Sequence, residues 1–315
     1  MKRRDFLKVS VAGAAAFAFS GLTFFSPRRT EAAKLNITLV AEAALKTMID
    51  GKEIHVWQFN DPADSGPGEL TSGLIVQEGD SVSITVENNL YLPINLVIPG
   101  VLNDSSVIFA GDSYTYLFTA PAAGSYMYFD DYNGETGRAM GLSGPLVVMP
   151  ADDPNSLYSG GPTFDQQYTL VLNELDDRFN AAIYNGQPYD MVEYEPNYFF
   201  VNGLSYPGTA NDDDTLMSMS LGENVAIRFI NTGLIISPQH FHGFHVNVAS
   251  RNRKPETTVV EKDTVAVDVG ECVDVILPVT QSGVYPLHTH FVPGVTANGT
   301  YLNPYGGALI IMSAS

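Results

Sequence analysis

The sequence contains little cysteine, little positive charge and no long uninterrupted apolar run. The only cysteine in 315 residues is Cys272, which excludes an intrachain disulfide. The chain has 16 Lys and Arg against 35 Asp and Glu, for a formal net charge of -19. Because phosphate binding needs Lys and Arg, this balance argues against nucleic acid as a partner. It suits an extracytoplasmic protein that stays soluble through self-repulsion or attracts cations.

The N-terminal segment has the features of an export signal. Arg3 and Arg4 precede Asp-Phe-Leu-Lys, which resembles the twin-arginine signal, and an apolar run interrupted by Gly and Ser extends from Val9 to Phe25. The run is short and diluted for a membrane span, so we expect cleavage after the small residues at 30–33, with a retained anchor as the alternative. This predicts a signal peptide over residues 1–33 and a periplasmic or otherwise extracytoplasmic location.

Sustained helical periodicity is scarce in the remaining sequence. Short apolar runs alternate with Gly, Pro, Asn and Asp at the spacing of an all-β sandwich or barrel. The irregular, Tyr-rich residues 176–195 predict a long connection. The predicted strands are 35–40, 53–59, 74–77, 81–87, 95–98, 113–119, 124–129, 144–149, 168–173, 197–201, 216–220, 224–231, 242–249, 264–267, 272–278, 283–288 and 307–312.

The two halves of the chain repeat one order of features. Each has a turn of Gly and acidic residues, a strand ending in Asn, a motif strand, a Gly-x-Tyr step and a Gly-rich closing strand. A Pro-, Asp-, Ser- and Gly-rich connector lies between them, around residues 150–162. Duplication of one β-sandwich explains this order. We therefore predict two tandem all-β domains, at residues 34–152 and 163–315.

Histidine is rare, and five of the six histidines lie in two short windows. His240 and His242 form one His-x-His step, and His288 and His290 form another. Both steps fall in segments that we interpret as strands, where alternate side chains share a face. Two such strands side by side would direct four imidazoles to one point, which is the chemistry of a metal site.

Several segments are similar to the multicopper oxidase family. Residues 225–231 followed by Pro-Gln-His240-Phe-His242-Gly resemble its copper-binding strand, and Gly-Val-Tyr-Pro-Leu-His288-Thr-His290 resembles its final ligand motif. Residues 124–128 and 141–148 match the family in the first half. The resemblance implies two cupredoxin-type Greek-key sandwiches, a type 1 copper bound by Cys and His, and an oxygen-reducing cluster bound by four His-x-His pairs.

The type 1 copper positions depart from the family pattern. Carried over to this chain, they hold Ser237, Thr289 and Gly294. A blue copper site needs a thiolate. Cys272 belongs to an unrelated strand, so we predict that the type 1 centre is absent. Laccase-type oxidation of phenols is therefore not expected.

The first half has also lost its imidazoles. The four positions that the resemblance assigns to histidine hold Val97, Pro99, Phe129 and Asp131. Only Asp131 retains a group that binds metal. Four neutral imidazoles would leave the charge of a divalent ion uncompensated, and Asp131 could supply a carboxylate from the same chain or from a neighbouring subunit. Because family relatives build such sites between the subunits of a trimer, a homotrimer is the assembly that the resemblance implies.

The predicted metal ligands are thus His240, His242, His288 and His290, with Asp131 and His245 as further candidates. His245 follows His242 by three residues and faces away on a regular strand, unless a bulge at Gly243 turns it inward. The alternative for the quartet is a set of relic histidines hydrogen-bonded in a polar seam. His55 is interpreted as structural.

We consider two functions. The first is an exported copper protein with a non-blue, histidine-rich site of one or two copper ions, with zinc or iron as alternatives. It would act as an oxidoreductase on a small ligand such as dioxygen or nitrite, or it would handle copper. Lacking type 1 copper, it would need direct access of the substrate to the metal, or an electron-donor partner. The second is a copper-free envelope scaffold, because some exported family members have lost every copper.

Overall fold

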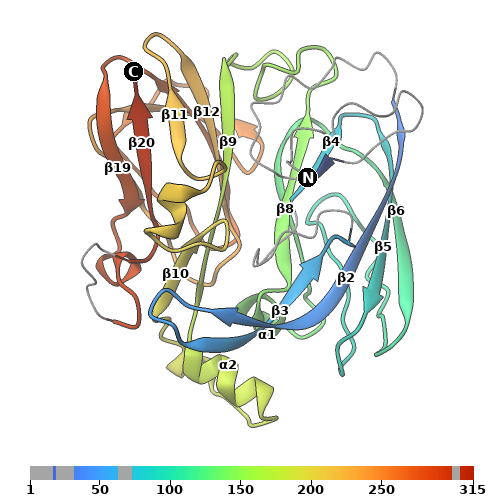
Figure 1. Cartoon of the computed structure of the whole chain (residues 1–315). Coiled ribbons are helices and arrows are strands. Elements are labelled where there is room, and N and C mark those ends of the chain that lie inside the picture. The colour runs from blue at the N-terminus through green and yellow to red at the C-terminus, as the bar shows by residue number, and fades with distance from the viewer. Residues whose placement is uncertain (1–16, 19–31, 63–72, 300–305) are drawn as a thin grey trace, which may run out of the picture.

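The computed structural model describes residues 17–18, 32–62, 73–299 and 306–315 (Figure 1). The twin-arginine motif and nearly all of the apolar run that follows it lie outside these residues. Two residues of the predicted signal segment, β1 (Phe17–Ala18), pair with β4. Within the described ranges, no helix is both long and apolar enough to cross a bilayer.

The first half folds into two sheets that share one apolar core. One sheet has the order β3-β2-β5-β6 and the other β1-β4-β8-β7. Strand β5 shows why the sequence folds this way, since Val82, Ile84 and Val86 are buried while the residues between them are not. The elements are β2 Lys34–Thr47, β3 Glu53–Asn60, β4 Leu74–Gln77, β5 Ser81–Asn88, β6 Ser113–Thr119, β7 Gly124–Phe129, α1 Glu135–Met140 and β8 Ser143–Met149.

The second half contains a larger sheet, β10-β9-β12-β18-β14-β15 with β16 paired to β14, and a smaller sheet, β11-β20-β19-β13-β17. Their facing side chains form a second apolar core. The elements are β9 Gln166–Leu175, α2 Asp177–Tyr184, η3 Met191–Glu193, β10 Tyr198–Val201, η4 Gly208–Asn211, β11 Met217–Met219, β12 Asn224–Asn231, β13 Gln239–Phe241, β14 Val246–Arg251, β15 Lys254–Pro255, β16 Glu261–Lys262, β17 Thr264–Val265, β18 Cys272–Pro278, β19 Gly283–Thr289, η5 Val292–Val295 and β20 Leu309–Ala314.

Strand pairing repeats between the halves, as the predicted duplication requires. β2 runs parallel to β5, which pairs antiparallel with β6; β9 runs parallel to β12, which pairs antiparallel with β18. In the other sheets, β4 is parallel to β8 and β8 antiparallel to β7, just as β11 is parallel to β20 and β20 antiparallel to β19. The predicted all-β fold of two cupredoxin-type domains is confirmed.

The two domains are joined through a buried polar contact. Arg228 of β12 and Asp274 of β18 lie 3.6 Å apart with their side chains out of solvent. Ser125 of β7, in the first domain, donates a hydrogen bond to Asp274 at 2.5 Å. Strands β12 and β18 are therefore buried on both faces, because the first domain covers the face that lies away from their own core.

Three predictions about local structure are wrong. Residues 95–98 form no strand, although Val97 makes a single bridge to Phe129. The connection 176–195 contains helix α2, whose first turn is capped by the Asp176 side chain. Residues 242–245 lie outside β14, because Gly243 takes φ +75 and turns the chain before the strand begins at Val246.

Candidate metal centre

The centre is built where β13 lies between β17 and β19. Antiparallel pairing places His240 directly opposite His288 on one side and Thr264 on the other. Side chains directly opposite each other in an antiparallel pair share a face and stand close together. The register alone therefore brings one histidine of each His-x-His step into contact.

The other two histidines lie just beyond the strand ends. We expected both His-x-His steps inside strands, but β13 ends at Phe241 and β19 at Thr289. The backbone N–H of His242 donates to Pro286 O at 3.1 Å, and that of His290 donates to Pro238 O at 2.6 Å. Each His-x-His step is therefore hydrogen-bonded to the segment that carries the other His-x-His step.

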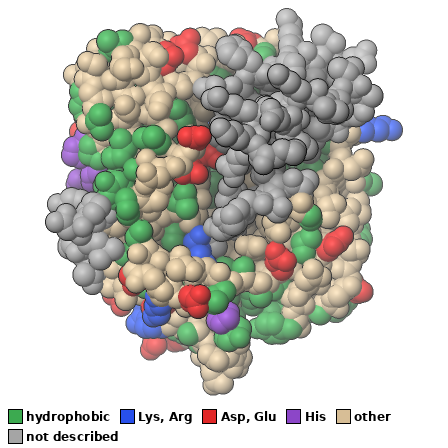
Figure 2. Space-filling model, in the orientation of Figure 1, with side chains coloured by type: hydrophobic (Ala, Val, Ile, Leu, Met, Phe, Trp, Pro, Cys, Tyr) green, Lys and Arg blue, Asp and Glu red, His purple; other side chains and the backbone are tan. Residues whose placement is uncertain are grey.

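The four imidazole rings lie near one another, although two of them stand outside the strands. The His240 ring centroid lies 4.7 Å from that of His242, 5.7 Å from His288 and 5.2 Å from His290. The His288 and His290 rings are 6.3 Å apart and nearly parallel. Figure 2 shows histidine side chains gathered at the left edge of the molecule, over the second domain.

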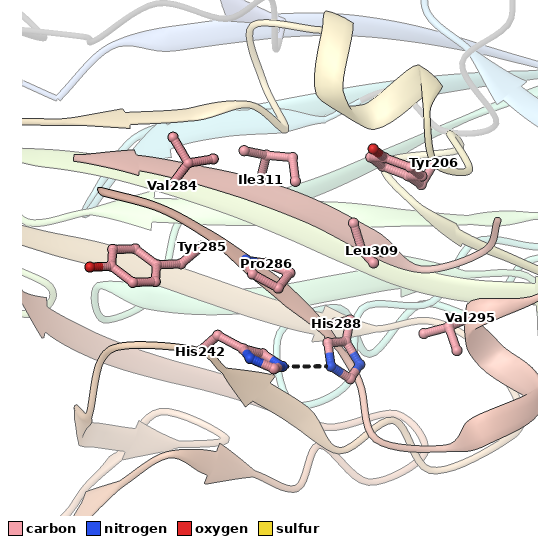
Figure 3. A pocket seen from close by; sticks show the side chains of 9 residues that line it. All are labelled: Tyr206, His242, Val284, Tyr285, Pro286, His288, Val295, Leu309 and Ile311. Atoms are coloured by element: carbon pink, nitrogen blue, oxygen red, sulfur yellow. Dashed lines mark hydrogen bonds between the residues drawn. The ribbon is translucent and has the colours of Figure 1, made fainter. Parts of the chain in front are cut away.

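Two ring nitrogens are already placed as a pair. His242 Nε2 and His288 Nε2 lie 3.1 Å apart. A dashed line joins the two rings in Figure 3. Two nitrogens at about 2.0–2.1 Å from a shared ion, a usual metal–imidazole distance, reach this separation at an angle of about 100° at the metal. Without an ion, the same distance is a hydrogen bond between neutral imidazoles.

The remaining ring nitrogens of two histidines are anchored by neighbouring residues. His288 Nδ1 donates to the carbonyl oxygen of Thr289 at 2.8 Å, so its Nε2 carries the lone pair. His240 Nδ1 lies 2.9 Å from Thr264 Oγ1. Such contacts orient metal-binding imidazoles and set which nitrogen is free. Both anchors leave Nε2 for a ligand or a metal.

The cluster also favours uncharged imidazoles. Desolvation lowers the pKa of His242, and the neighbouring His240 and His290 lower it further. Desolvation likewise lowers the pKa of His288, against the opposing effect of its hydrogen bond to Thr289. Since a metal binds the neutral ring, these shifts preserve the ligand form at neutral pH.

The further candidates lie apart from this cluster within the described residues. Asp131 is exposed in the first domain, where its carboxylate accepts a hydrogen bond from Asn95 Nδ2 at 2.6 Å. His245 is exposed on the turn that precedes β14. His55 stacks on Tyr184 with centroids 3.4 Å apart, in keeping with a structural role. Across the described ranges, no three His, Cys, Asp or Glu side chains are posed around one point as metal ligands.

The positions aligned with the type 1 copper ligands do lie together, but they bind each other. Ser237 Oγ is 3.4 Å from Thr289 Oγ1 and accepts a hydrogen bond from Gln239 Nε2 at 2.8 Å. A Cβ on Gly294 would stand 2.4 Å from Thr289 Cγ2, so no larger side chain fits there without displacement. Cys272 is buried elsewhere, against Met127, and burial raises the pKa of its thiol.

Two of the four altered first-domain positions are neighbours in the structure. Val97 and Phe129 pair through two backbone hydrogen bonds, of 2.9 and 3.1 Å, so the two altered motifs stand side by side. The Phe129 ring carries the Arg138 guanidinium at 5.3 Å from its centroid. Among the altered residues, Asp131 is the one that retains a metal-binding group.

A pocket beside the histidine pair escaped sequence reasoning. It has a volume of about 500 Å³ and is lined by His242, His288 and mainly apolar side chains of β19 and β20 (Figure 3). The available signal was the apolar alternation Val284, Pro286, His288 on β19.

Together, the fold and this cluster define a two-domain cupredoxin protein with a surface histidine centre. Family models described as multicopper oxidase match residues 46–153 and 184–302. The chain belongs to the multicopper oxidase family, which implies copper as the metal. A comparison with curated proteins finds no match.

Solved structures agree with this fold over most of the chain. The multicopper oxidase mgLAC is 26% identical, with a TM-score of 0.74 over 90% of this chain and 87% of its own. A blue copper oxidase from Nitrosomonas europaea is 24% identical, with a TM-score of 0.75 over 90% and 86%. A copper nitrite reductase from the same organism is 19% identical, with a TM-score of 0.69 over 90% and 94%.

Proposed function

We propose that the protein is an exported, non-blue copper protein that binds one or two copper ions at His240, His242, His288 and His290 and serves as an oxidoreductase for a small ligand. The observation that carries this is the pair of Nε2 atoms 3.1 Å apart on His242 and His288. Imidazole suits copper, and zinc and iron are the alternatives by ligand type.

Each histidine has a part in this proposal. His242 and His288 would be the first two ligands of an ion, because their Nε2 atoms stand 3.1 Å apart. His240 and His290 would be the further ligands, since their ring centroids lie 5.2 Å apart and that of His240 lies 4.7 Å from His242. Thr264 and the Thr289 carbonyl keep the Nε2 atoms directed at the ion. Bound copper would supply one-electron chemistry and an open position for dioxygen or nitrite.

The absence of a thiolate shapes the rest of the proposal. Ser237, Thr289 and Gly294 provide no blue-copper ligand, so electrons have no built-in entry at that place. Substrate must then reach the histidine centre directly, or a partner protein must donate electrons. We also propose that Asp131 completes the site from a second copy, within a homotrimer, because it is exposed and lies in the other domain.

The second candidate is a copper-free scaffold at the cell envelope. It is favoured by the lost imidazoles at Val97 and Phe129 and by the lack, among the described residues, of three ligand groups posed together. On this view the His242–His288 contact is a plain hydrogen bond.

Metal affinity separates the two candidates. Copper titration of His240→Ala and His288→Ala should show at least about a tenfold loss of affinity relative to the unsubstituted protein. His55→Ala is the matched control, because His55 stacks on Tyr184 in another part of the fold. Equal copper affinity in all three variants would retire the assignment.

A further inference from the structure

The pocket beside the histidine pair has an unusual wall for the outer face of a sheet. Alternation on β19 turns Val284, Pro286 and His288 outward, while Leu287 is buried in the core. The solvent face of an antiparallel sheet is ordinarily polar. Here Val284 is 68% exposed and stands at the end of the pocket away from the histidines.

Strand β20 continues this apolar wall. Its Ile311 pairs with Pro286 and its Leu309 with His288, so two of the three outward residues of β19 have an apolar neighbour across the ladder, while Val284 lies opposite Ser313. These side chains line the pocket together with His242, and we call its apolar part along β19 and β20 the trough; Figure 3 shows them on the side of the strands where the two imidazoles lie. The trough is thus apolar along its length and basic at one end.

The volume and charge of the pocket indicate the class of its occupant. About 500 Å³ lies within the range of small-molecule sites, roughly 300–1,000 Å³. Among the residues that the structure describes, the lining contains no Lys, Arg, Asp or Glu, in a chain whose net charge is -19. The side chains of this wall carry no charge that would balance a charged ligand body. Binding there is favoured by the burial of neutral apolar surface.

The polar end of the pocket restricts the head group of that ligand. His288 Nδ1 is engaged by Thr289, which leaves the adjacent Nε2 atoms of His288 and His242 as the ring nitrogens available there. A ligand with one hydroxyl or azole nitrogen would satisfy this pair, or would bind a metal held by it. The other polar side chains of the lining, among the described residues, are those of two tyrosines, and the hydroxyl of Tyr285 already donates to Ser282 O at 2.9 Å.

We propose that this pocket binds a neutral aromatic or aliphatic molecule, with its apolar body along β19 and β20 and a single polar head at His242 and His288. The inference rests on the proposed function and names the ligand class of the same centre. It admits a larger apolar substrate directly to the centre.

The test compares imidazole with 4-phenylimidazole by calorimetric titration of the full-length, copper-loaded protein. The phenyl group should raise affinity by about tenfold or more, because it buries apolar surface in the trough. Val284→Asp should abolish this preference and leave the copper content and the affinity for imidazole unchanged. Val192→Asp, at a position 91% exposed on η3, should keep the preference.

Failure of this inference differs from failure of the metal site. If the protein holds no copper, the metal proposal fails, and the same comparison in metal-free protein still decides the pocket. Equal affinities for the two probes in both forms would overturn the inference. So would loss of an oligomer on Val284→Asp, seen by light scattering, without any phenyl preference, since a second copy would then be the occupant.

Discussion

The buried side chain of Glu174 should make the free energy of unfolding depend on pH. Its carboxylate is buried on β9 and accepts hydrogen bonds from the backbone N–H groups of Leu234 and Ile235. The Leu234 bond measures 2.5 Å, and this loop leads directly into the histidine strand β13. Burial dominates and raises the pKa of Glu174 from 4.5 to about 7, against the opposing effects of these bonds and of Arg138.

The sign of the effect follows from proton linkage. The folded state holds the proton more tightly than the unfolded chain, so protonation stabilises the fold fully below about pH 4.5, and this contribution is lost as pH rises to about 7. A rise from 4.5 to about 7 corresponds to about 3 kcal/mol of unfolding free energy at about 1.36 kcal/mol per unit.

Glu174→Gln removes the titrating proton while keeping the side-chain volume. The free energy of unfolding is measured with denaturant and circular dichroism at each pH. Between about pH 4.5 and about pH 8, the difference between the variant and the unsubstituted protein should shift by about 3 kcal/mol in favour of the variant. Glu135→Gln is the control, because Glu135 also faces Arg138, at 3.9 Å, but is 61% exposed. Parallel stability curves for Glu174→Gln and the unsubstituted protein would refute the reasoning.

Two further predictions concern the anchors of the centre and the domain junction. Thr264→Val should lower copper affinity about tenfold, because it removes the hydroxyl that contacts His240 Nδ1. Thr115→Val is the control, since it loses only an exposed hydrogen bond to Thr85 and should leave copper affinity unchanged. Equal losses of affinity in the two variants, measured by copper titration, would contradict this. Asp274→Ala should lower the free energy of unfolding by about 3–5 kcal/mol, because it leaves the fully buried Arg228 guanidinium without its partner carboxylate. A decrease below about 1 kcal/mol in denaturant unfolding would argue against the buried pair.

Period-two alternation predicted much of the fold because most strands bury one face. Strand β4, in which alternate residues are buried, begins and ends where the sequence indicated. The strand predicted at residues 95–98 does not form, because side chains accept hydrogen bonds from its backbone. The N–H of Asn95 donates to the Asp130 carboxylate, and that of Leu96 donates to the Tyr116 hydroxyl. An apolar run does not reveal whether its N–H groups will pair with another strand.

The histidine quartet was predictable because ligand spacing and strand alternation are local properties. The ring positions of His242 and His290 beyond the strand ends were not, since they depend on backbone bonds to Pro286 and Pro238 from the opposite segment. The pocket likewise depends on the register between β19 and β20. Whether Asp131 joins the centre depends on a second chain, which no pattern within one chain specifies.

The most direct test of a non-blue copper centre is one measurement on protein exported natively under copper-replete conditions. Metal content per chain, taken with the absorption and electron paramagnetic resonance spectra of the same sample, should show one or two copper ions held by nitrogen ligands and no strong band near about 600 nm. Protein without bound metal would contradict the metal centre. A strong band near about 600 nm would contradict the absence of a type 1 copper.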